Sequence, residues 1–386
     1  MQRIAAKPRP NLQERARDLG FDILEFDGEP YWDESAYYAF SLKEIEDDLE
    51  APTNELATLC VELAGSIVGD ERALERLRIP EHAWDLIAQS WRRRDLSLYG
   101  RFDLAYDGTG PARLLEVNAD TPTSLFEAAV FQWMWLEDSI AQKALPADAD
   151  QFNALHEKLV ARLRLVANGH PLHLGYTLGN REDQGFIDYL DDCARQAGLK
   201  GTPIGMSDIG LRARGGFVDL ANRPIELLFK LEPWEYMLRA TFGKSPAMLT
   251  TRFIEPPWKM VLSNKGMLPL LWEMAPRHPN LLPAYFESEL GVSKLGGRYA
   301  RKPLYSREGG NVTLFDGGRV LDSTSGPFGA EGYIRQALVD PPCFSGRFPI
   351  IGSWLIGEEA CGIGIREQAA PITRNNARFV PHAIIG

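Results

Sequence analysis

Two carboxylates, an asparagine and an arginine lie close together in one segment, at spacings that suit a metal or an anion. The segment reads YGRFDLAYDGTGPARLLEVNADTPT, and its Asp-Gly-Thr-Gly run is typical of a hairpin turn. If Thr109-Gly110 forms a two-residue loop, Asp103 faces Glu116 and Arg101 faces Asn118. Because strand side chains alternate, the pattern predicts that all four project from one side of the hairpin.

Two carboxylates placed opposite each other destabilise a strand pair, unless a cation lies between them. Oxygens of Asp, Glu and Asn are hard ligands that Mg²⁺ accepts, usually together with phosphate oxygens and water. An arginine on the same face could bind the same anion through two hydrogen bonds. Two alternatives remain open: a solvated hairpin face whose charges pair with each other, and an acid/base pair of a glycosidase. Direct cross-strand neighbours fit one cation better than a sugar ring.

A second group of residues could bind phosphate. A predicted strand with Lys302 leads into the loop Ser-Arg-Glu-Gly-Gly-Asn, where glycines free the backbone to wrap an anion. The loop is neither a Walker A motif nor a Rossmann fingerprint. Lys265 and Arg366 are further candidate phosphate partners. The alternatives are an ordinary turn for the glycines and solvated surface charges for the basic side chains.

The first hundred residues, which precede the hairpin, are predicted to be mainly helical. Asn11 and Gly20 bound a short amphipathic pattern like an N-cap and a C-terminal glycine. Apolar residues recur at helical spacing over 35–68, and Pro52 is expected to divide this stretch into two helices. Pro80 is expected to start another helix.

In the rest of the chain, predicted strands and helices first alternate, and short strands then dominate. The segment 173–204 reads as strand, helix, strand, which is typical of an α/β sheet. From Tyr299 onward short strands dominate. We expect a helical part over 1–98, an α/β part with the metal and substrate residues over 99–260, and a β-rich nucleotide-binding part over 261–386.

Composition limits the classes of function. The 386 residues are 45% hydrophobic and 25% charged, which excludes collagen, coiled coil and bulk disorder. The net charge of −11 argues against a nucleic-acid partner, although a local basic cluster could still bind one small anion. The four cysteines form no CxxC pair, and no apolar run reaches the ~18 residues of a membrane helix. We expect a cytoplasmic protein without a membrane partner, and the sequence indicates no oligomeric state.

Four ordered motifs resemble one known family. They are Tyr99-Gly-Arg-Phe-Asp, Glu116-Val-Asn-Ala-Asp, Asn264-Lys-Gly-Met-Leu-Pro-Leu-Leu-Trp, and Arg301-Lys-Pro followed by Glu-Gly-Gly-Asn. Together they resemble the C-terminal synthetase domain of the glutathionylspermidine synthase family, an ATP-grasp fold. The resemblance runs from about residue 10 to the C-terminus and is strongest to stand-alone bacterial members. An upstream amidase domain is expected to be absent, because the chain begins directly at the synthetase.

The resemblance implies an ATP-dependent ligase that joins a carboxylate to an amine through an acyl phosphate. By this resemblance Asp103, Glu116 and Asn118 match the Mg²⁺ ligands, and Arg101 matches the arginine that stabilises the transferring phosphoryl group. The residues that match ATP contacts are Lys265, Lys302, Gly309 and Gly310 in the phosphate-covering loop, Gln336, Ala337, Leu338 and Val339 at the adenine, and Arg366 near the phosphates.

The match on the substrate side is weaker. Thr121 and Thr123 stand where the family has serines that approach glutathione, so a hydroxyl is retained. Glu182 and Asp183 stand near a glutamate pair that holds the polyamine, but Asp is shorter, and a solvated loop is the alternative. Residues 198–260 resemble the family only loosely. The expected substrates are a peptide carboxylate and a polyamine or another amine.

Two other classes of function remain alternatives to the ligase. One is an ATP-binding regulatory module without ligase activity, and the other is a metal-dependent glycosidase or phosphoesterase with no need for ATP. The complete set of Arg101, Asp103, Glu116 and Asn118 favours catalysis, because a protein that only binds nucleotide would not need the whole charge-stabilising group.

Overall fold

The computed structural model describes residues 1–21, 23–26, 28–212 and 215–386. Its strands are β1 (Gln2–Ala5), β2 (Glu25–Phe26), β3 (Glu29–Pro30), β4 (Ala36–Phe40), β5 (Tyr99–Ala105), β6 (Arg113–Asn118), β7 (Leu172–Tyr176), β8 (Gly201–Gly205), β9 (Gly210–Leu211), β10 (Phe217–Val218), β11 (Leu227–Lys230), β12 (Arg252–Ile254), β13 (Ala284–Phe286), β14 (Tyr299–Pro303), β15 (Thr313–Asp316), β16 (Arg319–Ser323), β17 (Tyr333–Ala337), β18 (Phe348–Ile356), β19 (Glu359–Gln368), β20 (Arg378–Val380) and β21 (His382–Ile384).

The α-helices are α1 (Leu12–Asp18), α2 (Ala51–Ile67), α3 (Glu71–Arg76), α4 (Trp84–Arg92), α5 (Gln132–Ala141), α6 (Leu155–Ala167), α7 (Arg181–Gln196), α8 (Trp234–Met237), α9 (Ala247–Thr250) and α10 (Met267–Met274). Two π-helical segments are η1 (Glu44–Glu50) and η3 (Glu127–Phe131), and short 3-10 turns are η2 (Glu81–Ala83), η4 (Met206–Asp208), η5 (Thr241–Lys244), η6 (Pro257–Val261) and η7 (Leu290–Leu295). No helix in these described ranges is long and apolar enough to cross a membrane.

The centre of the molecule is an antiparallel sheet in the order β20-β19-β18-β5-β6. Alternate side chains of its central strand β18 enter two different cores. Ile351 and Leu355 lie in a core with the α2 residue Leu56, whereas Trp354 lies in another core with the α6 residue Leu159. Burial on both faces explains why β18 reads as an almost continuous apolar run.

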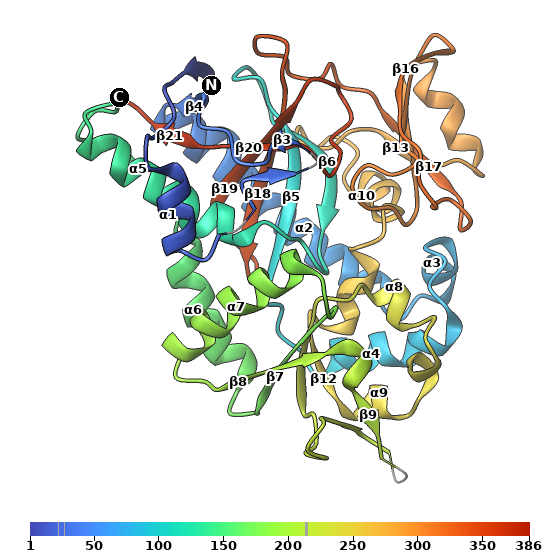
Figure 1. Cartoon of the computed structure of the whole chain (residues 1–386). Coiled ribbons are helices and arrows are strands. Elements are labelled where there is room, and N and C mark those ends of the chain that lie inside the picture. The colour runs from blue at the N-terminus through green and yellow to red at the C-terminus, as the bar shows by residue number, and fades with distance from the viewer. Residues whose placement is uncertain (22, 27, 213–214) are drawn as a thin grey trace.

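Two further sheets lie on different sides of the β5–β6 hairpin (Figure 1). The antiparallel sheet β13-β17-β14-β15-β16 forms the β-rich lobe, and the parallel sheet β12-β11-β7-β8 forms the opposite end. The predicted strand, helix, strand alternation is confirmed as β7, α7 and β8. The proposed boundary at residue 260 stays a prediction, and β5 and β6 share their sheet with β18, β19 and β20.

A three-stranded sheet brings the two ends of the chain together. Its order is β1-β4-β21, with β1 antiparallel and β21 parallel to β4. The N and C labels of Figure 1 lie near each other on this side of the molecule. Arg3 of β1 also pairs with the fully buried Glu367 of β19 at 2.7 Å, which ties the small sheet to the central one.

The prediction of two helices divided at Pro52 is wrong in two respects. Residues 36–40 form β4 instead of the start of a helix, because their alternating buried and half-buried side chains fit between two partner strands. Pro52 then lies in the first turn of α2, which follows η1 directly. A proline is tolerated there because its missing N–H is not needed in a first helical turn.

The hairpin loop also differs from the predicted two-residue turn. β5 ends at Ala105 and β6 begins at Arg113, and a bulge between Asp103 and Leu104 shifts the register by one residue. The Asp107 side chain accepts a hydrogen bond from the Thr109 N–H at 2.8 Å, which shapes the longer loop. The bulge restores the predicted pairing at the functional end of the hairpin.

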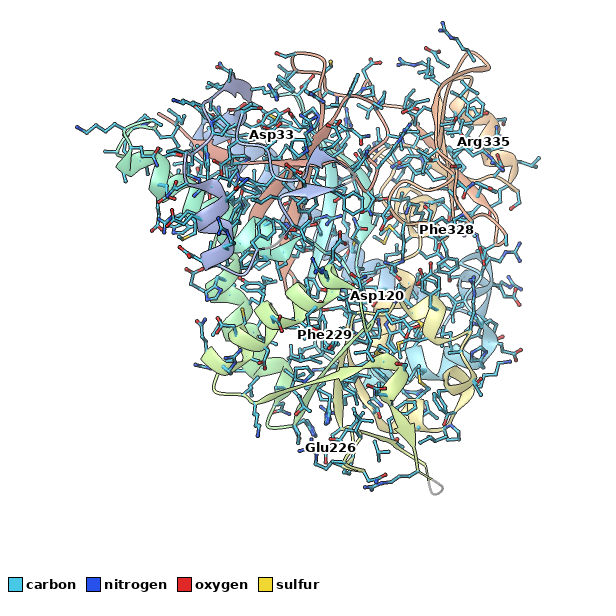
Figure 2. The ribbon with its side chains drawn as sticks, viewed as in Figure 1. Asp33, Asp120, Glu226, Phe229, Phe328 and Arg335 are labelled. Atoms are coloured by element: carbon cyan, nitrogen blue, oxygen red, sulfur yellow. The ribbon has the colours of Figure 1, made fainter. Side chains whose placement is uncertain are left out.

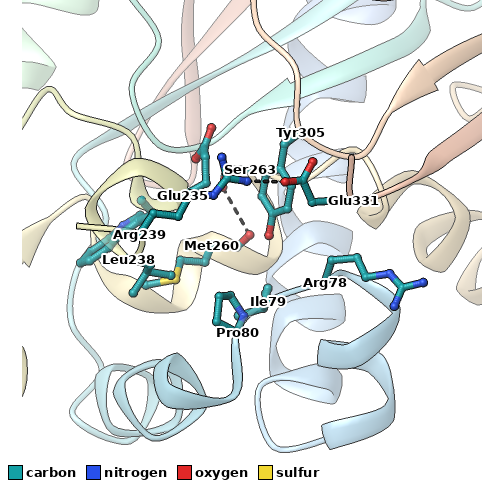
Figure 3. Close-up of a pocket in the computed structure, with 11 residues that line it drawn as sticks. Arg78, Ile79, Pro80, Glu235, Leu238, Arg239, Met260, Ser263, Tyr305 and Glu331 are labelled. Atoms are coloured by element: carbon teal, nitrogen blue, oxygen red, sulfur yellow. Dashed lines mark hydrogen bonds and ion pairs between the residues drawn. The ribbon is translucent and has the colours of Figure 1, made fainter. Parts of the chain in front are cut away.

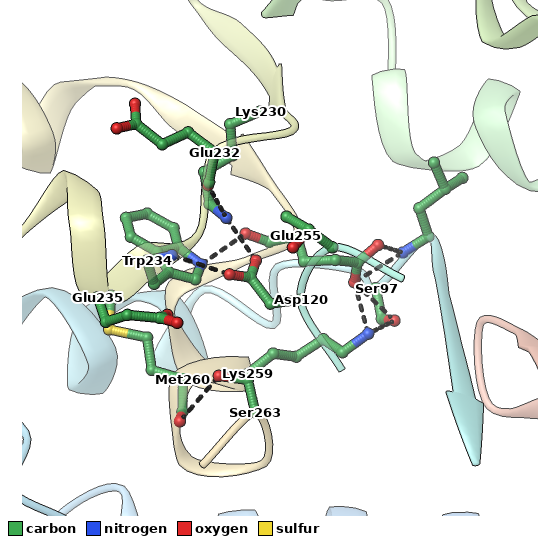
Figure 4. Close-up of polar contacts among 12 residues, drawn as sticks. Ser97, Asp120, Lys230, Glu232, Trp234, Glu235, Glu255, Lys259, Met260 and Ser263 are labelled. Carbon is green, nitrogen blue, oxygen red and sulfur yellow. Dashed lines mark hydrogen bonds and ion pairs between the residues drawn. The ribbon is translucent and has the colours of Figure 1, made fainter. Parts of the chain in front are cut away.

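A buried ion pair fastens the start of β5 to the segment 255–259 (Figure 4). Glu255 is 0% exposed, and its carboxylate binds the Lys259 ammonium at 2.7 Å. It also accepts hydrogen bonds from the backbone N–H groups of Leu98 and Tyr99 at 3.0 and 2.9 Å. Burial raises the pKa of Glu255, against the effect of Lys259. The carboxylate therefore holds four donors, Ser97 included, at the entry to the central sheet.

We predict that Glu255→Ala lowers the free energy of unfolding by about 3–5 kcal/mol, because it leaves the Lys259 charge buried and unpaired. Urea unfolding followed by circular dichroism measures this change. The control is Glu226→Ala, which removes an exposed carboxylate that pairs with His170 at the far end of the parallel sheet (Figure 2); about 0–1 kcal/mol is expected for it. The double variant Glu255→Gln/Lys259→Met should recover most of the loss. Equal losses in the single variant and the control would contradict the prediction.

Candidate active site

Two adjoining cavities lie at the β5–β6 hairpin and share Asp103, Glu116, Gly309 and Thr373 in their walls. The larger has a volume of about 380 Å³ and the smaller about 120 Å³. Of the residues predicted from the sequence, the larger cavity is lined by Arg101, Asp103, Glu116, Asn118, Thr121, Thr123, Glu182, Asp183, Lys265, Gly309 and Arg366. The smaller is lined by Asp103, Glu116, Lys302, Gly309, Gln336, Ala337, Leu338 and Val339. Gly310 lies beside them.

The predicted cross-strand pairing is confirmed. Asp103 is the partner of Glu116, and Arg101 is the partner of Asn118. Arg101 Nε donates to Asp103 Oδ1 at 2.7 Å, which confirms that these two side chains share a face. Arg366 Nη2 donates to Asp103 Oδ2 at 2.9 Å from the neighbouring part of the sheet. Two arginines thus compensate one buried carboxylate in the cavity wall.

A glycine on β18 makes room for Arg101. A Cβ atom at Gly352 would lie 2.7 Å from Arg101 Cδ, so a larger residue would displace the arginine. The guanidinium lies 5.3 Å from the centre of the Trp354 ring and donates to the Thr123 carbonyl oxygen at 3.0 Å. Gly352 was not predicted as a site residue, because the sequence around a glycine inside a strand does not reveal which side chain packs against it.

Two lysines surround Glu116. Lys265 Nζ lies 3.1 Å from Glu116 Oε2, and Lys302 Nζ donates to the Leu115 carbonyl oxygen and to Gln336 Oε1, both at 2.8 Å. Burial opposes ionisation of Glu116, but Lys265 and Lys302 outweigh it and hold the pKa of the carboxyl below its usual range. Burial lowers the pKa of Lys302 to about 8, although Glu116 favours its charged form.

The smaller cavity has the walls of a binding site for a flat, mainly apolar group. The side chains of Val312, Leu314, Ile350 and Ile372 line it together with the segment 336–339. The Gln336 amide is fixed, because its Nε2 donates to the Leu114 carbonyl oxygen at 2.9 Å. A cavity with apolar walls and a few fixed polar groups is the usual form of a small-molecule site.

The glycine-rich loop bends over the boundary between the cavities. Glu308 and Gly309 have φ values of 53° and 69°, in the left-handed region. A Cβ atom at Gly309 would lie 2.4 Å from the Thr373 carbonyl oxygen, so only glycine fits there. At Gly310 a Cβ would lie 2.8 Å from the ring of Phe328, a residue labelled in Figure 2. The loop therefore needs both glycines for close approach of its backbone.

The predicted substrate residues lie around the larger cavity. Thr121 Oγ1 accepts a hydrogen bond from Arg307 at 2.9 Å, and Thr123 is exposed in the cavity wall. Glu182 and Asp183 lie in the first turn of α7, where both their N–H groups donate to the Asn180 side chain. Burial raises the pKa of both carboxyls, and the pKa of Glu182 is raised further by Glu308 and Asp183.

A buried ion pair beneath the cavity was not found from the sequence (Figure 4). Lys230 is 0% exposed and pairs with Asp120, whose Oδ2 accepts the Trp234 N–H at 2.9 Å. The ammonium lies 4.5 Å from the centre of the Trp234 ring. Asp120 follows the Glu-Val-Asn-Ala run, so the pair fixes the segment that joins the hairpin to the two threonines. The only sign of this pair in the sequence is that Lys230 lies in an apolar run, and this does not show which carboxylate it pairs with.

A third cavity of about 220 Å³ adjoins the larger one and shares Glu235, Ser263 and Tyr305 with it (Figure 3). An ion pair between Arg239 and Glu331 closes part of its wall. Glu235 also lies 3.3 Å from Arg307 of the glycine-rich loop. The site therefore extends beyond the predicted residues, toward α8.

Comparisons with known proteins agree with this geometry. Residues 3–385 match the family model described as glutathionylspermidine synthase preATP-grasp. The chain is similar to a Haemophilus influenzae protein provisionally named acid–amine ligase, with 40% identity over the full length of both. It is 28% identical to trypanothione synthetase of Crithidia fasciculata, with 83% of this chain and 52% of that protein covered. It is 24% identical to the bifunctional glutathionylspermidine synthetase/amidase of Escherichia coli, with 90% and 60% covered.

The fold also has a solved counterpart. A glutathione synthetase-like effector from Globodera pallida matches with a TM-score of 0.59 over 98% of both chains, at 10% sequence identity. This likeness confirms the predicted mixed α/β fold of the ATP-grasp type. With the family model spanning nearly every residue, the chain belongs to the glutathionylspermidine synthase preATP-grasp family, a family of ATP-dependent carboxylate–amine ligases.

Proposed function

We propose that this chain uses ATP and Mg²⁺ to join a peptide carboxylate to a cationic amine in the two adjoining cavities. The observation that carries the proposal is the meeting of Arg101, Arg366 and Lys265 with Asp103 and Glu116 at the boundary between those cavities. A nucleotide base in the smaller cavity would direct its phosphates toward this boundary. The carboxylate and the amine would then approach from the larger cavity.

The donor set at the hairpin fits Mg²⁺ bound together with phosphate. Asp103 and Glu116 supply carboxylate oxygens, and Asn118 supplies an amide whose Nδ2 has no partner among the described residues. No group of three or more His, Cys, Asp or Glu side chains in the described ranges is arranged as a metal site. Two carboxylates and one amide leave positions for phosphate oxygens and water, as Mg²⁺ prefers. The bound ion would neutralise charge on the transferring phosphoryl group.

The chain's own cations act in the first half of the reaction. A carboxylate is a poor acyl donor, so transfer of the γ-phosphoryl group converts it to an acyl phosphate. Arg101 and Arg366 would move from Asp103 to the phosphoryl oxygens, where their charge stabilises the transition state. Lys265 and Lys302 would hold the remaining phosphates. In the second half an amine attacks the acyl carbon, and phosphate leaves.

Enclosure of the site protects the acyl phosphate. The glycine-rich loop is held over the larger cavity by Arg307, which binds Thr121 and Glu235. Exclusion of water prevents hydrolysis before the amine attacks. Thr121 and Thr123 are our candidates for carboxylate binding, and Glu182 and Asp183 for binding of the cationic amine. We also propose a cytoplasmic location, supported by four cysteines that are all free thiols in the described part of the chain.

The test measures ADP release with Mg²⁺·ATP across a panel of small peptides and polyamines that includes glutathione and spermidine. We predict that one peptide–amine pair of this panel stimulates the release. Arg101→Ala should lower kcat by about 10²–10³-fold on that pair, because it removes a donor to the developing charge. The control is Arg195→Ala, which removes an exposed arginine from α7.

The alternative functions give different outcomes in that assay. Tight ATP binding without turnover on any pair would favour the regulatory module. Absence of a thermal shift with Mg²⁺·ATP would contradict both the ligase and the module. Retention of full activity in Arg101→Ala would remove the arginine from the mechanism.

The pKa of Lys302, about 8, predicts that ATP binding weakens at alkaline pH. A lysine whose pKa is lowered to this value is charged at pH 7 and loses its proton as the pH rises through 8. The Kd of ATP should therefore rise by up to about tenfold per pH unit above that point. Isothermal titration calorimetry between pH 7 and 9 measures it. Lys302→Met should bind more weakly at pH 7 and lose this dependence, so an unchanged pH profile would contradict the assignment.

The acidic pair at α7 predicts selectivity for a cationic amine. Glu182→Gln and Asp183→Asn should each raise the KM of the amine by about tenfold, because one attractive charge is lost in a partly enclosed site. The KM of the carboxylate substrate should not change. The control Asp188→Asn removes an exposed charge from the same helix, where Asp188 accepts a hydrogen bond from Gln184. An equal rise in both KM values would show that the pair only shapes the loop.

A further inference from the structure

A tyrosine–carboxylate pair in the wall of the larger cavity has no part in the mechanism described so far. Tyr31 lines the cavity, and its hydroxyl donates to Glu127 Oε1 at 2.6 Å. Glu127 is only 9% exposed and is the first residue of η3. The two residues are far apart in the sequence, so the fold brings a buried carboxylate against the hydroxyl of a half-buried tyrosine in the cavity wall.

The pair adjoins the cavity that contains the residues proposed to bind phosphate and the amine, because Tyr31 lines that cavity. The charged groups that act on it are Arg101 of β5 and Arg366 of β19 on the phosphate side, and Glu182 of α7 on the amine side. The pair therefore adjoins the cavity in which, under the proposed function, the acyl phosphate and the amine would meet.

The backbone beside the pair is strained. Ser124 has a φ of 76°, an unusual value for a residue with a side chain, and it also lines the cavity. η3 is a π-helical turn, a form that occurs often at functional sites. Strain of this kind persists where the surrounding structure holds it, and it concentrates at active sites.

The second half of the reaction needs a proton acceptor. An alkylamine is protonated at neutral pH and cannot attack until it loses a proton. Both hairpin carboxylates already have partners, since Asp103 is held by two arginines and Glu116 lies between two lysines, which lower the pKa of Glu116 against the effect of burial. In contrast, burial raises the pKa of Glu127, although the hydrogen bond from Tyr31 opposes this effect. Glu127 is therefore a stronger proton acceptor than Glu116, and it has no cation as a hydrogen-bonded partner among the described residues.

We propose that Tyr31 and Glu127 form a proton relay that deprotonates the attacking amine, an inference that rests on the ligase function proposed above. The amine gives a proton to Tyr31 Oη while Tyr31 gives its own proton to the Glu127 carboxylate. The nitrogen lone pair forms the C–N bond at the acyl carbon, and the C–O bond to phosphate breaks with its electrons on the phosphate. The nitrogen loses its second proton to this departing phosphate, which leaves the neutral amide. Glu127 then returns its proton through Tyr31 to the departing phosphate or to water.

The Tyr31 ring is held in place without help from its hydroxyl. It packs against the ring of Phe379 at 5.1 Å and that of Phe21 at 6.3 Å between centroids. Tyr31→Phe should therefore keep the ring in position and remove only the hydroxyl. Glu127→Gln keeps the shape and an oxygen that can accept from Tyr31, but it removes the basic carboxylate.

The test compares two nucleophiles on the same acyl phosphate. The carboxylate is the one that gives most ADP release in the panel, and the nucleophiles are its partner amine and hydroxylamine, which is uncharged at neutral pH and needs no base. In Tyr31→Phe and Glu127→Gln we expect kcat with the amine to fall about 100-fold at pH 7, with the hydroxylamine rate changed less than threefold. The remaining amine rate should rise about tenfold per pH unit. The control Tyr37→Phe, at a half-buried tyrosine packed on Trp135, should behave as the parent chain.

Each other outcome overturns a stated claim. Equal losses with the amine and hydroxylamine would mean that the pair only positions the site, and the relay would be wrong while the ligase function stands. An unchanged amine rate in both variants would also refute the relay. A third outcome is that the unsubstituted chain releases no ADP with any peptide–amine pair, and none when hydroxylamine replaces the amine. In that case the ligase function is wrong, and the relay is wrong with it.

Discussion

The site depends on one electrostatic constraint: two carboxylates, Asp103 and Glu116, are fixed opposite each other on a sheet face that is largely removed from water. Two like charges at this spacing repel strongly in a medium of low dielectric constant. Cations from three other segments of the chain compensate this repulsion. Arg366 comes from β19, Lys265 lies just before α10, and Lys302 comes from β14. The β-rich lobe and the central sheet are thereby joined through the site itself.

This constraint also explains why the site is ready for phosphate. In the absence of substrate each cation has a carboxylate or carbonyl partner, so none is buried alone. Under the proposed function, a metal bound between the carboxylates would neutralise them, and the same cations would become available to an anion. Substrate binding would then change the partners of charges that are already in place, and little reorganisation would be needed at the moment of reaction.

The hairpin part of the site could be predicted from the sequence because the residues that indicate it lie close together along the chain. Alternation along two strands was enough to pair Asp103 with Glu116, and the pairing survived an error in the loop because a bulge compensated for it. The strands after Tyr299 and the β7–α7–β8 unit were predicted for the same reason. β4 was missed because its residues fit a helical period as well as a strand, and only its partners β1 and β21 decide between them.

The residues that were missed act over long distances in the sequence. Gly352 is needed because the Arg101 side chain packs directly against it, and Lys230 is needed because it forms a buried ion pair with Asp120. Tyr31 joins the site from a segment ~70 residues before the hairpin. Neither composition nor periodicity reveals such long-range contacts. The resemblance to a known family, in contrast, suggested a role for residues such as Gln336, whose local sequence contains no recognisable motif.

The placement of β21 beside β4 has a consequence for synthesis of the chain. β4 is formed from residues 36–40, yet one of its two neighbours is contributed by residues 382–384. In a growing chain, β4 therefore has one unpaired edge until residues 382–384 have left the ribosome. Such edges recruit other strands. During that time, pairing of β4 with a strand from another chain competes with formation of the native sheet.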